Sequence, residues 1–187
     1  MSELRIYADG SAQLLQRVTD GQTIAASLAA INVTFERWQA DRKLDATTSN
    51  DDIIAAYRPS VDRLMKQYAF QSVDVISLRP DHPEREMLRN KFLSEHTHSD
   101  FEVRFFVDGR GLFFIHDQGK VYGLLCEAGD LISVPAHVRH WFDMGARPDF
   151  KCIRLFTTPE GWVANYTGDD IAKRFPRFDD YLASHAA

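Results

Sequence analysis

The chain has 187 residues, about the length of one domain and enough to bury a sizeable core. Its 27 acidic residues outnumber its 22 Lys and Arg, and the net charge of −5 argues against nucleic-acid binding and against a basic membrane-surface role. A hydrophobic content of 44% excludes a disordered or collagen-like chain, and no apolar run approaches the ~18 residues that span a membrane. The two cysteines are too few for a disulfide scaffold. We therefore expect a cytoplasmic protein with no nucleic-acid or membrane partner and, because no apolar stripe demands one, a monomer.

Residues 1 to about 82 combine helix and strand patterns. Alternating residues indicate strands, and apolar residues at helical spacing indicate helices. Pro59 lies inside the longest helical segment, so we expect a kink or a break there. The elements predicted in residues 1–93 are a strand at 4–8, a helix at 23–33, a strand at 33–38, a helix at about 51–70 and a short polar helix at 81–93.

From residue 96 to 157 the pattern changes to short runs rich in β-branched and aromatic residues, separated by turn sequences such as Asp108-Gly109. Strands that repeat at about 8–12 residues are typical of an antiparallel barrel or sandwich. The expected strands lie at 101–107, 111–116, 120–127, 130–135, 139–144 and 150–156.

These elements predict a mainly β fold with accessory helices (α+β), in a single domain spanning 1–187. We expect a barrel core at about 90–157. The N-terminal strand and helix segment at about 1–82 and the tail at about 158–187, with one or two short helices, would pack on this core.

Histidines gather in the barrel region, and the sharpest pattern is His96-Thr-His98 followed by Glu102. Residues two apart on a strand face the same side, so these three side chains can project into one interior. Two imidazoles and a carboxylate suit a first-row divalent ion. His140 lies on a separate predicted strand and can supply a fourth ligand, although His137 competes for that position. Octahedral coordination would leave two adjacent positions for substrate or water, which is typical of a catalytic site.

The same residues match the two motifs of the cupin family. The pattern H-x-H-x₃-E-x₆-G appears as His96, His98, Glu102 and Gly109, and the second motif as Gly129, Pro135 and His140. His137 and Met144 stand where the second motif has Gly and Asn. The resemblance implies an antiparallel cupin β-barrel (a double-stranded β-helix, or jelly roll). Its spacing favours His140 as the fourth ligand and leaves His137 in a loop or behind the ligands.

Within the cupins the chain resembles the acireductone dioxygenase family in its bacterial form. The similar segments cover nearly the whole chain and lie at 24–40, 91–116, 129–145 and 152–166. The resemblance implies oxidation of acireductone (1,2-dihydroxy-3-keto-5-methylthiopentene) by O₂ in the methionine salvage pathway. One Fe(II) or Ni(II) per chain is implied, with Mn or Co as possible substitutes. The Fe(II) form would give 4-methylthio-2-oxobutanoate and formate, and the Ni(II) form 3-methylthiopropanoate, formate and carbon monoxide.

An anionic substrate on such a metal needs compensating positive charge, and arginine stays cationic in a partly dry site. Arg104 shares the strand parity of Glu102, and Arg154 lies in an otherwise apolar strand, so both are predicted catalytic residues. The methylthio tail needs an apolar wall. Its predicted residues are Phe92, Phe105, Phe142 and Trp162, of which Phe105 has the opposite strand parity to Glu102.

Four further residues carry smaller expectations. Glu95 is a candidate for orienting a ligand imidazole, with a surface carboxylate as the alternative. His116 is expected to be structural or solvated, and Cys126 and Cys152 to be buried small residues. Two other functions fit the four ligands less well: a different cupin metal enzyme, and a non-enzymatic cupin that binds small ligands. The native metal and the general base stay open.

Overall fold

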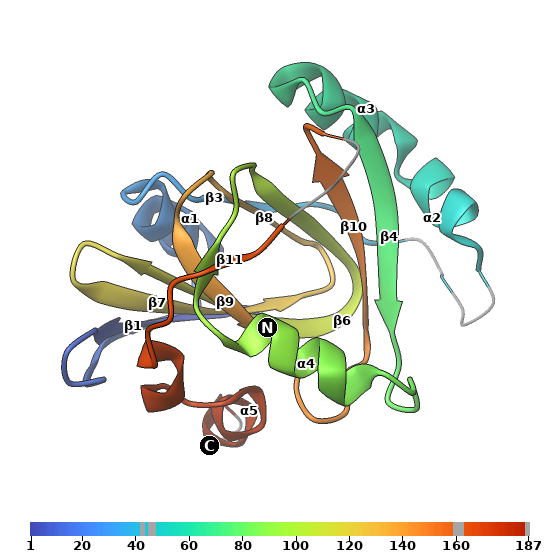
Figure 1. Cartoon of the computed structure of the whole chain (residues 1–187). Coiled ribbons are helices and arrows are strands. Elements are labelled where there is room, and N and C mark those ends of the chain that lie inside the picture. Colours follow the sequence, from blue (N-terminus) through green and yellow to red (C-terminus); the bar gives the residue numbers. More distant parts are fainter. Residues whose placement is uncertain (42–43, 45–47, 159–162, 186–187) are drawn as a thin grey trace.

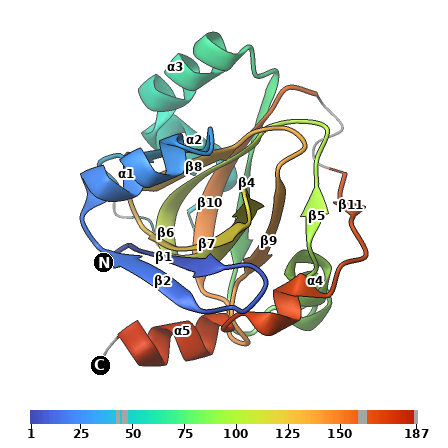
Figure 2. The same cartoon turned by 90° about the vertical axis from the view of Figure 1, so that its left-hand side faces the viewer.

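The computed structural model describes residues 1–41, 44, 48–158 and 163–185 (Figure 1). Strands dominate, and helices lie on the outside of the sheets (Figures 1 and 2). The strands are β1 (Glu3–Ala8), β2 (Leu14–Val18), β3 (Thr34–Arg37), β4 (Ser72–Leu78), β5 (His96–Thr97), β6 (Glu102–Asp117), β7 (Lys120–Glu127), β8 (Asp130–Val134), β9 (Arg139–Asp143), β10 (Phe150–Phe156) and β11 (Asn165–Tyr166). The helices are α1 (Gly21–Ala29), α2 (Asn50–Ala56), α3 (Arg58–Tyr68), α4 (Arg85–Leu93), the 3-10 helix η1 (Ile171–Arg174) and α5 (Phe178–His185).

Strand β6 belongs to two antiparallel sheets that enclose a common interior. Its first half pairs with β8 and β10, and its second half pairs with β7 and β9. One sheet has the strand order β11-β5-β9-β6-β7-β1-β2. The other sheet has the order β4-β10-β6-β8-β3. This arrangement confirms the predicted mainly antiparallel β fold with accessory helices, as the cupin resemblance implies.

The long β6 corrects one prediction. Asp108-Gly109 was expected to end a strand, but the strand continues through both residues to Asp117. Gly109 has a φ of +73°, and the register against β10 shifts between Lys151 and Cys152. The shift makes Val107 the extra residue between Phe106 and Asp108, and such a β-bulge bends a strand without ending it. The bend lets one strand leave the first sheet and enter the second.

Three strands escaped prediction: β2, β4 and the two-residue β11. The side chains of β2 are exposed at four of five positions, so Leu14 and Leu15 do not alternate with polar residues as in a half-buried strand. In β4 the sequence Ser-Val-Asp-Val-Ile-Ser-Leu does alternate in part, and it follows α3 closely. The predicted break at Pro59 is confirmed, because α2 ends at Ala56 and the proline occupies the first turn of α3.

The buried apolar side chains form three clusters. The first fills the barrel interior and includes Phe106, Phe113 and Phe142. The second lies between the outer face of the β10 sheet and helices α2 and α3, and the third lies beneath η1 and α5. Both cysteines are free and buried, as predicted. Within the described residues, no helix combines the length and the apolar character needed to cross a membrane.

The close approach of Gly109 to Asp149 leads to a prediction about stability. A Cβ on Gly109 would lie 1.9 Å from the carbonyl oxygen of Asp149, whereas Gly119 has a similar φ of +72° and open space around it. Gly119→Ala should lower the free energy of unfolding by only the left-handed backbone penalty of about 1–2 kcal/mol. Gly109→Ala adds the backbone clash, so it should lower the free energy of unfolding by about 3–5 kcal/mol. Urea unfolding of both variants measures the difference, and equal losses would contradict the close approach.

Candidate metal centre and cavity

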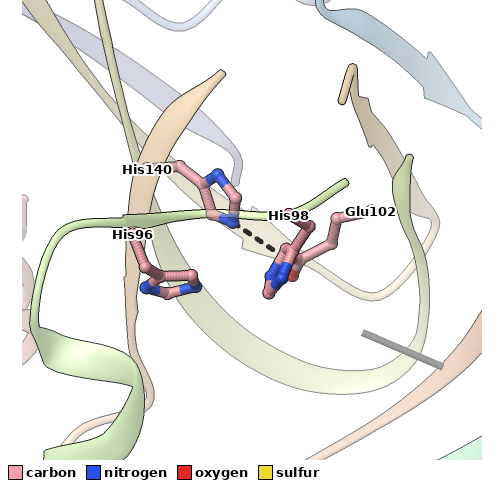
Figure 3. A group of neighbouring side chains, drawn as sticks. All are labelled: His96, His98, Glu102 and His140. Atoms are coloured by element: carbon pink, nitrogen blue, oxygen red, sulfur yellow. Dashed lines mark hydrogen bonds and ion pairs between the residues drawn. The ribbon is translucent and has the colours of Figure 1, made fainter. Parts of the chain in front are cut away.

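Four side chains from three strands and one loop meet in the barrel interior (Figure 3). His96 comes from β5, His98 from the loop after it, Glu102 from the start of β6 and His140 from β9. His96 and His140 are directly paired across β5 and β9, which places their rings on one face. One ligand atom from each residue lies within 4.8 Å of all the others, and every one of these residues is buried. The structure thus brings together the four predicted metal ligands.

Each imidazole is held from behind by a backbone carbonyl. The Nδ1 atoms of His96, His98 and His140 lie 2.7, 2.9 and 2.8 Å from the carbonyl oxygens of Ser94, Val163 and Val138. A carbonyl oxygen only accepts hydrogen bonds, so each Nδ1 must carry a proton. In a neutral imidazole the other nitrogen, Nε2, then has a lone pair, which is the form that ligates metals.

The carboxylate indicates that a proton or a metal ion lies between these groups. Oε2 of Glu102 lies 3.0 Å from Nε2 of His98. It lies 2.9 Å from Nε2 of His140, a contact that is dashed in Figure 3. Two lone-pair acceptors at that distance repel each other unless a proton or a metal ion sits between them. Three imidazoles and one carboxylate fit a first-row divalent ion, and four protein ligands leave room for further ligands on it. The residues present therefore fit a divalent metal.

The charges respond to burial and to one another. Burial disfavours ionisation of Glu102, but the positive charge of Arg104 and hydrogen bonds from His140 and His98 outweigh it and hold the pKa of Glu102 well below its ordinary value. Burial opposes the imidazolium of His98 as well, yet the hydrogen bond to Glu102 and its charge raise the pKa of His98. Burial, together with the charge of His140, lowers the pKa of His96 to about 4. His96 is thus neutral, the state required for a ligand.

The other histidines and Glu95 lie outside this group. His137 is exposed in the turn before β9, where its φ of +65° takes the conformation that glycine commonly adopts, and its N–H donates to the carbonyl of His98 at 2.8 Å. His116 is buried and lies 2.6 Å from Oε1 of Glu95, whose Oε2 accepts from Thr167. The hypothesis that Glu95 orients a ligand imidazole is therefore wrong in this structure. Backbone carbonyls do that instead, and Glu95 is buried.

A cavity of about 370 Å³ opens onto the four-residue group. Arg104 and Arg154 both line it, because they are directly opposite each other in the β6–β10 pair and face the same side. Nε of Arg104 donates to Oε1 of Glu102 at 2.8 Å. Arg154 makes a two-pronged contact with Asp74 on β4, at 2.8 and 2.6 Å. Both predicted arginines thus reach the cavity, each already facing a carboxylate.

Aromatic side chains form the apolar part of the wall. Phe92 and Phe142 line the cavity, with ring centroids 6.5 Å apart. Gly111 makes room for Phe142, since a Cβ there would lie 2.4 Å from its ring. Phe105 points the other way and packs on Trp38 and Tyr57, with centroids 4.8 and 5.0 Å away.

The structure therefore does not bring Phe105 to the cavity, because the strand parity of β6 holds up to the bulge. Trp162 lies outside the described residues. Sequence reasoning also missed several lining residues, among them Asp74, Lys91 and Phe156. Asp74 lies on β4, which was not predicted, so no signal connected it to Arg154.

Removal of one ligand should abolish tight metal binding. We expect His140→Ala to weaken binding of Ni(II) at least ~100-fold, because a lost ligand costs more than a lost supporting contact. His137→Asn is the matched control, since it removes an exposed imidazole three residues away and Asn tolerates a positive φ. Isothermal titration calorimetry measures both. Comparable weakening in the two variants would contradict the ligand assignment.

Metal uptake should depend on pH through His98. Its pKa is raised, so in the metal-free protein a proton must leave before Nε2 can bind a metal. Affinity should therefore fall as the pH drops below that pKa, by about tenfold per pH unit for each proton displaced. Calorimetry in buffers of different ionisation enthalpy counts the released protons. An affinity that is the same at acidic and at neutral pH would contradict the arrangement.

Comparisons with known proteins agree with this geometry. The model of the ARD/ARD' family matches residues 3–164. An acireductone dioxygenase of Methylococcus capsulatus is 57% identical over 186 residues, which is 100% of each chain. One of Aquifex aeolicus is 58% identical over 182 residues, covering 97% of this chain and 99% of its own.

A solved structure is similar as well. It is described as acireductone dioxygenase from Bacillus anthracis with a cadmium ion in its active center, and it is 30% identical to this chain. The TM-score is 0.78, with 89% of this chain and 98% of the other covered. The family model and these full-length relatives agree, and this chain belongs to the ARD/ARD' family of dioxygenases.

Proposed function

We propose that this chain oxidises acireductone with O₂ in the methionine salvage pathway. The observation that carries the proposal is the buried set of three imidazoles and one carboxylate at a cavity that also holds two arginines. Full-length relatives named acireductone dioxygenase support the choice of substrate.

His96, His98, Glu102 and His140 would hold one Fe(II) or Ni(II) per chain, and Mn(II) or Co(II) would fit the same ligands. When bound, the ion would supply Lewis-acid chemistry to the substrate. The Fe(II) enzyme gives 4-methylthio-2-oxobutanoate and formate. The Ni(II) enzyme gives 3-methylthiopropanoate, formate and carbon monoxide.

The protein's own part is charge balance and orientation. Three neutral imidazoles and one carboxylate leave a divalent ion with a single net positive charge, so a dianionic substrate brings excess negative charge. Arg104 and Arg154 place guanidinium groups on the cavity wall and stay cationic there. They stabilise the bound anion and the negative charge that develops on its oxygens.

The apolar wall selects the methylthio end of the substrate. Phe92 and Phe142 offer aromatic surface to the sulfur, a favourable contact for a thioether. Trp162 completes this wall in our proposal, and Phe105 is left out of it.

We further infer that the chain acts as a cytoplasmic monomer in one domain spanning 1–187. It has a barrel core at about 90–157, with the segments 1–82 and 158–187 packed on it.

Anaerobic reconstitution tests the function. Metal-free protein is loaded separately with Fe(II) and Ni(II), then given acireductone and O₂, and the keto acid, formate and carbon monoxide are quantified. We expect keto acid from the iron form and carbon monoxide only from the nickel form. His140→Ala should show only spontaneous oxidation, while His137→Asn should retain the activity.

Two outcomes would contradict the proposal and indicate the alternatives. Metal-loaded protein that does not oxidise acireductone above the spontaneous background would indicate a different cupin metal enzyme. Protein that takes up no metal at all would indicate a binding module without enzymatic activity.

A further inference from the structure

We propose that Arg104 is a positioning residue that makes Glu102 a one-oxygen ligand and thereby keeps two coordination positions of the metal open. The inference rests on the metal centre of the proposed function but not on its substrate. It concerns the two oxygens of one carboxylate, which have different partners.

The two carboxylate oxygens of Glu102 contact different side chains. Oε1 accepts a hydrogen bond from Nε of Arg104 at 2.8 Å, and Oε2 lies within 3.0 Å of Nε2 of both His98 and His140. Oε2 therefore faces the imidazoles, while Oε1 faces the guanidinium. A carboxylate must offer both oxygens to bind one ion in a bidentate manner. With Oε1 held beside the guanidinium of Arg104, only Oε2 faces His98 and His140, where the metal would be held.

Arg104 is held too firmly to yield this contact. Its side chain is 2% exposed, and its guanidinium carbon lies 4.7 Å from the ring centroid of Phe142, 5.4 Å from that of Phe113 and 5.6 Å from that of Phe92. Arg104 and Glu102 also lie two apart on β6, so strand geometry places them on one face. Both the backbone and the aromatic packing fix the guanidinium beside Oε1.

The consequence is a count of ligands. Three imidazoles and one carboxylate oxygen occupy four positions of a six-coordinate ion and leave about two for water or substrate. A bidentate Glu102 would leave about one, which is too few for a substrate that binds through two oxygens. The guanidinium thus acts on the metal through Glu102 and needs no direct contact with it.

Water counting on Mn(II)-loaded protein tests this inference, because water-proton relaxation reports how many water molecules the ion binds. We expect about two in the unaltered protein and about one in Arg104→Met, where Oε1 is released to the metal. Methionine keeps the length and apolar packing of the arginine stem.

Arg154→Met is the matched control. It removes the same charge from the same cavity, from the residue directly opposite in the β6–β10 pair, but its partner is Asp74. This variant should retain about two waters. An unchanged count in Arg104→Met would overturn the proposal. An equal fall in both variants would also overturn it, because charge alone would then explain the effect.

A second measurement needs no variant at Arg104, in case Arg104→Met fails to fold. Protein labelled with ¹³C at the glutamate carboxyls is compared by infrared spectroscopy with and without Mn(II). A one-oxygen ligand should show a wide separation of the antisymmetric and symmetric carboxylate bands, and a narrow separation would overturn the proposal. Neither experiment uses acireductone or O₂, so a different substrate would leave both results intact.

Discussion

The negative charge of Glu102 sits in a barrel interior that is otherwise mostly aromatic and aliphatic. Glu102 is 2% exposed, and an unpaired carboxylate at such depth costs several kcal/mol. Arg104, His98 and His140 surround it, and the pKa of Glu102 accordingly falls despite the burial. Each partner needs its own support in turn: aromatic rings under the guanidinium and backbone carbonyls behind the imidazoles. Much of the architecture near the cavity can be understood as satisfying this one buried charge.

Strand β6 does most of that work because it belongs to both sheets. It carries Glu102 and Arg104 in the half that pairs with β8 and β10, and a bulge at Val107 precedes the half that pairs with β9, the strand of His140. The two halves of β6 thus lie in different sheets, and Oε2 of Glu102 meets Nε2 of His140 at 2.9 Å between them. The bulge therefore links the fold to the site.

The sequence predicted the ligands well because their signal is local. His96, His98 and Glu102 lie close together in the chain, and the parity of a strand was enough to group them, even though β5 covers only His96 and Thr97. The same parity argued against Phe105, which packs on the far side of the sheet.

The features that could not be predicted are contacts between residues far apart in the chain. The carbonyl that orients His98 belongs to Val163, and the carboxylate that holds Arg154 belongs to Asp74 on an unpredicted strand. Neither a carbonyl contact nor an ion pair between distant strands leaves a pattern in composition or periodicity. The continuation of β6 through Asp108-Gly109 was missed for a different reason, because Asp-Gly is also typical of a turn that ends a strand.

The two cysteines acquire a particular meaning in a chain of this family. Both are fully buried, and burial raises the pKa of each thiol, so neither forms a thiolate at neutral pH. The thiolate is the form that peroxides attack and that exchanges disulfides. Cys152 lies on β10 two residues from Arg154, and it pairs with Phe106, which is two residues from Arg104 on β6. A dioxygenase chain folded in this way keeps both of its thiols out of reach of peroxides, while the exposed Met1 and Met87 remain open to oxidation.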